Sequence, residues 1–231
     1  MKPTLPTLMS LNGGYVDTAG FLALNGLFTA HVTGNFVTFG AAMVNGTAGG
    51  LTKLLALPVF CAMVLGTRLL AYRLPPRGLP VLKTMLVLQV LLLAAGAALA
   101  IGLGPFPKGD SWAGFTTGMV LVAAMAIQNA AHRIHLGSAP PTTLMTGTTT
   151  QVMIDLADML HGSIPPGSPA RARLGRMVTS VAAFAVGCGA AALCYSLNAG
   201  WCFVVPVLVA LPGLWSAEVA AAGDGTPERP A

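Results

Sequence analysis

The feature that most constrains the fold is a series of long apolar runs with almost no charge inside them. Runs such as 81–103 and 112–131 are about as long as the roughly 20-residue helix that crosses a bilayer. Only 8% of the 231 residues are charged. A soluble domain carries roughly a quarter, so a soluble fold would lack the groups to cover its surface. Because the runs do not alternate with period two, the sequence predicts an all-α integral membrane protein rather than a barrel.

Glycine, proline and charged residues divide the chain into six long spans and two short segments. We expect spans at about 14–30, 54–74, 81–103, 112–131, 177–197 and 201–215, with short segments at 35–44 and 143–160. The whole chain, 1–231, is predicted to be one membrane domain. Its polar end, 222–231, contains two prolines and is predicted to be a disordered tail.

The two halves of the chain match in the order of their segments. Each half opens with a long span, continues with a short segment introduced by a Thr-Gly pair, and closes with two more spans. Asp17 lies 16 residues before Thr33, and Asn129 lies 17 residues before Thr146. This order predicts an internal repeat, with 10–104 as repeat 1 and 111–217 as repeat 2.

The positive charges predict how such a chain crosses the membrane. If the short segments are half-helices that enter the membrane and return, and the N-terminus is cytoplasmic, ten of the 12 Lys and Arg residues lie inside. Lys53 and Lys108 lie outside, which obeys the positive-inside rule. A full crossing by 143–160 would instead put the three arginines between Arg171 and Arg176 outside. About six spans, three per half, make the second repeat inverted, a design that recurs in transporters and channels.

The first Thr-Gly pair belongs to a polar group, His31, Thr33, Gly34 and Asn35, that interrupts an apolar run. Glycine permits a sharp turn, and Thr and Asn are favourable N-caps for the half-helix that follows. A helix that begins within the membrane presents unpaired N–H groups and a partial positive charge, which suit an anion or a polar solute. The alternative interpretation is a capped break that only allows short helices to pack.

The second pair, Thr146 and Gly147, is predicted to introduce the other half-helix in the same way. The two half-helices would enter from opposite faces, so their N-termini would meet near the middle of the membrane. Several threonines between Thr142 and Thr150 would give the second segment a hydroxyl-rich, wet lining, although threonine can also bond back to its own helix.

Asp17 is the acid of the first span. An unpaired carboxylate within a membrane is costly, so Asp17 is a candidate functional residue. We expect it to carry a coupling proton or to contact Arg133. The alternative is a position at the headgroup level or a role in capping a helix.

A second polar cluster closes the fourth span. Gln128 and His132 share one helix face, and Asn129 and Arg133 share the next. Amides and a guanidinium on adjoining faces suit a carboxylate, a phosphate or a similar anion. The alternative is that the amides join helices while Arg133 extends to the membrane interface.

No motif indicates an enzyme, a cofactor or a metal. The histidines at the end of the fourth span lack a recognised metal-ligand spacing. No phosphate-binding loop, Ser-His-Asp arrangement or nucleotide fingerprint occurs. The net charge of +5 lies in short loops, where it fits membrane topology better than nucleic-acid binding. We expect no cofactor, no metal and no nucleic-acid partner.

Four segments together resemble a known family: 14–21 (GYVDTAGF), 28–35 (FTAHVTGN), 126–130 (AIQNA) and 142–147 (TTLMTG). They are similar to segments of the YoaK family of uncharacterised bacterial membrane proteins, and the resemblance covers about 10–217. That family usually has glycine where Ala126 stands and often asparagine where Thr148 stands. The resemblance implies a multi-spanning protein of the bacterial inner membrane, and it implies no substrate.

These observations predict an inner-membrane transporter of a small polar or anionic solute, with its site between the two half-helix N-termini and both chain termini in the cytoplasm. A passive channel of the same architecture is the first alternative, and a membrane enzyme or a structural subunit is the second. Gly114–Gly118 and the small-residue stretch 182–192 are available for contacts in a homo-oligomer.

Overall fold

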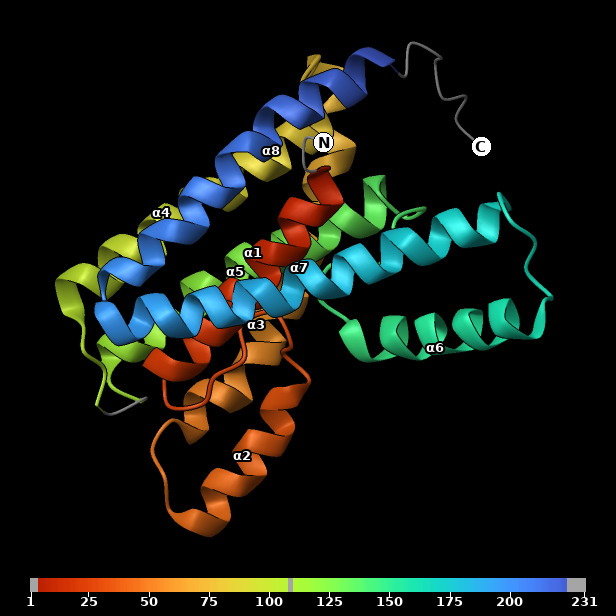
Figure 1. The fold of residues 1–231 in the computed structure, drawn as a ribbon. Coiled ribbons are helices and arrows are strands. Elements are labelled where there is room, and N and C mark those ends of the chain that lie inside the picture. The colour runs from red at the N-terminus through yellow and green to blue at the C-terminus, as the bar shows by residue number, and fades with distance from the viewer. Residues whose placement is uncertain (1–3, 108–109, 224–231) are drawn as a thin grey trace.

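The computed structural model describes residues 4–107 and 110–223, and every regular element in them is helical (Figure 1). The helices are α1 (Leu5–Ala23), α2 (Gly34–Asn45), α3 (Gly50–Arg73), α4 (Val81–Leu103), α5 (Trp112–His135), α6 (Met145–His161), α7 (Pro169–Leu197) and α8 (Val204–Gly223). Two 3₁₀ turns, Pro75–Arg77 and Trp201–Phe203, precede α4 and α8. Within the described residues, α3, α4, α5 and α7 are long and apolar enough to cross a membrane. The prediction of an all-helical chain with membrane-length helices is therefore confirmed.

The first helix, α1, has different bounds from the span predicted at 14–30. Helix α1 begins at Leu5, with Pro6 in its first turn, where proline is well tolerated. It ends at Ala23 because Asn25 and Gly26 adopt positive φ angles of 56° and 84°, which no α-helix continues. Residues 24–33 form a linker that leads to α2.

Six of the helices run the length of the bundle in alternating directions. At one end, the starts of α1 and α4 meet the end of α8 through Leu5, Leu86 and Leu214. At the other end, the C-terminal parts of α1 and α4 meet the start of the last 3₁₀ turn around Ala23 and Trp201. Helices α1, α4 and α7 therefore run one way, and α3, α5 and α8 run the other way (Figure 1).

The tightest helix crossing joins α1 to α7. A Cβ atom placed on Gly14 would lie 2.2 Å from the carbonyl oxygen of Phe184, and one on Gly187 would lie 2.1 Å from that of Leu11. Both distances are too short for any side chain, so glycine is required on both helices. The small residues of 182–192 therefore include Ala183, Gly187 and Ala191 buried within the protein, where they are not free for contacts with another copy.

Helices α2 and α6 project from the bundle, and each packs against one long helix: α2 on α3 and α6 on α7 (Figure 1). Both helices end at a glycine in the left-handed conformation, Gly46 and Gly162. Asp155 is a buried residue of α6, and its carboxylate accepts hydrogen bonds from Arg173 of α7 at 2.9 and 3.0 Å. The predicted short segments at 35–44 and 143–160 thus exist as separate helices.

The starts of the short helices differ from the prediction. Thr33 occupies the N-cap of α2 but makes no capping bond with its side chain. Helix α6 already begins at Met145, so Thr146 and Gly147 lie in its first turn rather than before it. The tail predicted to be disordered, 222–231, begins in the last turn of α8, and its remainder from residue 224 lies outside the described residues.

One loop contact fixes the start of α3. The carboxylate of Asp110, in the loop before α5, accepts hydrogen bonds from the backbone N–H groups of Gly49 and Thr52 at 3.1 and 3.0 Å. Burial alone would raise the pKa of Asp110, but these bonds and the Thr52 hydroxyl outweigh it and hold the pKa below its ordinary value. Asp110 therefore caps α3 from a different part of the chain.

Candidate functional site

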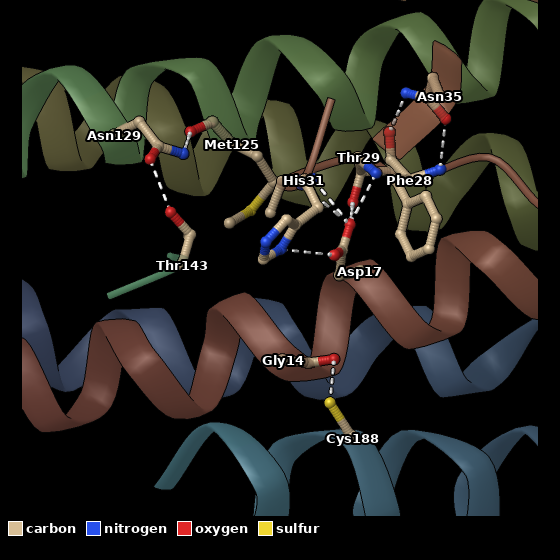
Figure 2. Close-up of polar contacts among 11 residues, drawn as sticks. Gly14, Asp17, Phe28, Thr29, His31, Asn35, Met125, Asn129, Thr143 and Cys188 are labelled. Carbon is tan, nitrogen blue, oxygen red and sulfur yellow. Dashed lines mark hydrogen bonds and ion pairs between the residues drawn. The ribbon is translucent and has the colours of Figure 1, made fainter. Parts of the chain in front are cut away.

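The linker between α1 and α2 is wrapped around the carboxylate of Asp17. Oδ1 of Asp17 accepts hydrogen bonds from the backbone N–H groups of Thr29 at 2.7 Å and Ala30 at 2.8 Å (Figure 2). Oδ2 lies 3.6 Å from Nδ1 of His31. Asp17 is 5% exposed, so the burial cost of its charge is offset by backbone dipoles and the imidazole. Its partners lie in its own linker, and the expected contact with Arg133 is replaced by these bonds.

Asn35 closes the same linker from the other side. Its amide nitrogen donates to the Phe28 carbonyl at 2.7 Å, and its amide oxygen accepts from the Phe28 N–H at 2.8 Å (Figure 2). This reciprocal pair holds residues 28–35 as a closed turn. Asn35 therefore shapes the linker instead of capping α2 or lining a cavity.

The second linker, between α5 and α6, is held in a comparable way. The Asn129 side chain accepts a hydrogen bond from the Thr143 hydroxyl at 2.7 Å and donates to the Met125 carbonyl at 2.9 Å (Figure 2). His132 is buried, and its Nε2 lies 3.0 Å from the Pro140 carbonyl oxygen. Both linkers thus fold back against polar side chains of the helix that precedes them.

A cavity of about 330 Å³ lies where the two linkers meet. Its wall contains Thr33 and Leu144, the N-cap residues of α2 and α6. The other polar residues on the wall are His31, Asn129, His132, Arg133, Thr142 and Thr143. Residues from the two halves of the chain therefore face one space.

One group on this wall is left without a partner. The Thr142 side chain is 2% exposed, and its hydroxyl has no hydrogen-bond partner among the described residues. A buried hydroxyl without a partner costs free energy, so such groups in native proteins usually have a water or a ligand nearby. The Thr142 hydroxyl is thus a candidate contact for a water molecule or a ligand.

The structure brings five of the predicted site residues to the cavity wall: His31, Thr33, Asn129, His132 and Arg133. Arg133 is exposed, so it stands at the rim. Asp17 and Gly34 instead line a neighbouring cavity that shares His31. Thr146 and Gly147 are exposed on α6, away from either cavity.

Gln128 joins helices and lines no large cavity. It is fully buried, donates to the Met9 carbonyl at 2.9 Å and accepts from the Gln89 amide at 2.7 Å. Beside it, both polar atoms of the Asn12 side chain lack a partner among the described residues, next to a space of about 10 Å³. That volume is about the size that one water molecule occupies.

The start of α2 does not present the free N–H groups that the sequence suggested. The Gly34 N–H donates to the His31 carbonyl at 2.8 Å, and the Asn35 N–H donates to the Val32 carbonyl at 3.1 Å. The N–H of Phe36 is used in the same way. The backbone N–H groups that would otherwise attract an anion are therefore already hydrogen-bonded within a tight turn at the start of the helix.

The sequence did not reveal the apolar residues that line the two cavities. Phe60 and Val64 of α3 face the first cavity, and Phe184 and Cys188 of α7 face the neighbouring one. Helices that are apolar all round carry no periodic signal of which side faces the protein. In the described residues, no group of three or more His, Cys, Asp and Glu could hold a metal ion.

Comparisons with known proteins give a family and nothing beyond it. Neither the curated proteins nor the solved structures contain a match to this chain. One family model, described as "Protein of unknown function (DUF1275)", matches residues 5–215 and so covers both halves of the bundle and both linkers. The chain therefore belongs to this uncharacterised family, as the resemblance of its linker motifs to YoaK-like membrane proteins led us to expect.

Proposed function

We propose that this chain is a transporter of a small polar or anionic solute, and that the solute binds in the cavity between the starts of α2 and α6. The observation that carries the proposal is Thr142, which lines this cavity and whose buried hydroxyl has no partner among the described residues. A solute with a hydrogen-bonding group would satisfy it. Polar sites formed by interrupted helices at the interface of two repeats are typical of secondary transporters.

The proposal includes six membrane spans, α1, α3, α4, α5, α7 and α8, in two inverted repeats at 10–104 and 111–217. The packing supports this arrangement, because α1 against α7 corresponds to α5 against α3, and α1 against α8 corresponds to α5 against α4. The pair α2 and α3 likewise corresponds to α6 and α7. Since α1 and α5 run in opposite directions, corresponding helices would be related by inversion across the membrane.

The proposal that the solute is an anion depends on Arg133. Because the N–H groups at the start of α2 are used within its own first turn, the helix dipole is a weak source of attraction there. A guanidinium at the rim supplies a full charge and suits a carboxylate or a phosphate. Arg133 would then select anions, while Thr142 and Asn129 would contact any polar solute.

The location that we propose is the bacterial inner membrane, with both termini in the cytoplasm. Lys53 belongs to the end of the bundle that holds Asp110, and Arg176 belongs to the end that holds the start of α1. This separation supports the charge-based topology, in which the arginine-rich end is cytoplasmic.

The test is uptake by purified protein reconstituted into liposomes, with labelled acetate, phosphate, glycine and urea as probes. We expect saturable uptake of at least one probe above that of empty liposomes. Thr142→Val, which removes the hydroxyl at nearly constant volume, should lower the apparent affinity by about fivefold, the worth of one hydrogen bond. Thr149→Val is the matched control, because Thr149 is exposed on α6 and outside the cavity.

The remaining outcomes separate the alternatives. Arg133→Gln should lower uptake of acetate or phosphate and leave glycine and urea unchanged. Uptake that rises linearly with concentration would favour a passive channel of the same architecture. The proposal is overturned if no probe enters faster than into empty liposomes, or if Thr142→Val and Thr149→Val behave alike.

A further inference from the structure

A second cavity, of about 470 Å³, shares His31 with the first. It is formed between α1, α7 and the linker that precedes α2. Its wall includes Asp17, Phe21, Phe28, His31, Phe184 and Cys188. This volume lies within the range of roughly 300–1,000 Å³ that is usual for small-molecule sites.

One oxygen of the Asp17 carboxylate is paired with an imidazole but accepts no hydrogen bond among the described residues. Oδ1 of Asp17 is held by the N–H groups of Thr29 and Ala30, which keep the carboxylate in place. Among the described residues, Oδ2 has only the His31 imidazole nearby, at 3.6 Å from Nδ1. That distance is too long for a hydrogen bond. Oδ2 therefore has acceptor capacity left in a side chain that is more than nine-tenths buried.

A row of aromatic rings adjoins this oxygen. The ring centroids of Phe21 and Phe28 are 4.9 Å apart, and those of Phe28 and His31 are 6.4 Å apart. Phe184 of α7 continues the row at 6.5 Å from His31. Aromatic faces attract organic cations, and several rings around one space are the usual way in which proteins bind ammonium groups.

The charges of the wall exclude an anion and favour a cation. The residues that line the cavity include the Asp17 carboxylate, the His31 imidazole paired with it, and no Lys or Arg. Gly34, at the start of α2, lines it as well, but its N–H is already bonded to the His31 carbonyl. An anion would therefore meet the Asp17 carboxylate and no lysine or arginine side chain that could attract it.

We propose that this cavity binds an organic ammonium ion, with the cationic head against Oδ2 of Asp17 and its apolar part among the phenylalanine rings. This site is distinct from the one between the two linkers, and it does not depend on transport. It assigns to Asp17 a ligand contact in addition to its part in holding the linker.

The test is equilibrium dialysis of the purified full-length chain in detergent with labelled benzyltrimethylammonium. Phenylmethanesulfonate, which has the same shape and the opposite charge, is the matched competitor. We expect the cation to bind and the sulfonate to leave its binding unchanged. Phe184→Leu should weaken binding by about fivefold, because one cation–π contact is lost. Phe115→Leu, on α5 and outside the cavity, should bind as the unaltered chain does.

The carboxylate is tested by Asp17→Asn, which should lower the affinity at least about tenfold, with Asp110→Asn as the control for the loss of a charge elsewhere. If the Asp17→Asn variant does not elute as a folded protein in size-exclusion chromatography, the binding of the cation to the Phe184→Leu variant decides whether the proposal holds. Equal displacement by the sulfonate, or equal affinity of the Phe184 and Phe115 variants, would overturn the proposal. Thr142→Val should leave cation binding intact, so failure of the transport proposal would be seen separately.

Discussion

Asp17 lies in α1 and Asn129 in α5, and each side chain accepts a hydrogen bond from the linker that follows its own helix. The difference lies in charge. Asp17 is ionisable and accepts hydrogen bonds from three backbone N–H groups, whereas Asn129 is neutral and accepts one from a hydroxyl. The first linker is therefore held by stronger, charge-assisted bonds than the second.

At the residue scale, we predict that Asp17→Ala lowers the free energy of unfolding by about 3 kcal/mol, because two buried N–H groups lose an ionised acceptor. Asp17→Asn should cost less, since an amide oxygen can still accept. Denaturant unfolding in detergent, followed by circular dichroism, measures both. Asp158→Ala, at an exposed position of α6, should change little. Equal stability of the Asp17 and Asp158 alanine variants would contradict this account.

The way in which two helices pack depends on how closely their backbones approach each other. Helices α1 and α7 cross at Gly14 and Gly187, where each Cα lies against a carbonyl of the other helix. This crossing carries Phe184 and Cys188 to the cavity beside Asp17. The position of that cavity wall is thus a direct consequence of two glycines.

At the scale of the element, we predict that Gly187→Ala lowers the free energy of unfolding by about 2 kcal/mol or more, because the new Cβ would lie 2.1 Å from the Leu11 carbonyl and must push α1 away. Gly189→Ala is the matched control on the same helix. No atom lies within 4 Å of the corresponding Cβ, so the variant should be as stable as the unaltered chain or slightly more so. Thermal unfolding of both variants in the same detergent checks this, and a Gly187 variant as stable as the Gly189 variant would refute it.

The whole molecule is organised around the correspondence of its helix pairs. Helix α5 contacts α3 and α4, as α1 contacts α7 and α8, and α4 packs on α8 across the junction of the halves. The two linkers meet in the resulting space, so both halves are needed to enclose the cavity. Such a site cannot form from either half alone.

At the scale of the molecule, we predict that the turns after α2 and after α6 lie on opposite sides of the membrane. The four native cysteines are first replaced, and Thr47→Cys and Ser163→Cys are introduced singly, both at exposed turn positions. A membrane-impermeant thiol reagent should label position 47 in intact cells and position 163 only after permeabilisation. Labelling of position 163 from outside would mean that α6 crosses the membrane, and the inverted repeat would have to be abandoned.

The sequence by itself determined the helical class, the membrane length of the long helices and the order of the elements. With 8% charged residues, the sequence predicted helices long and apolar enough to cross a membrane, and Gly, Pro and Asn mark where most of the helices stop. The same signals predicted two short helices and five of the residues that share a cavity, His31, Thr33, Asn129, His132 and Arg133. Local chemistry was sufficient for these features, because helix length and turn residues act within a few positions.

Only the tertiary structure decided which polar groups meet. Gln128 and Asn129 are neighbours in sequence, yet one joins three helices and the other holds a linker. The N–H groups of α2 were expected to be free and are consumed by its own first turn. Phe184 lines the same cavity as the acid of α1, although it comes from a helix without a polar side to orient it. The physical reason is that side-chain pairing depends on backbone approach between distant helices, which glycines permit but which no local pattern specifies.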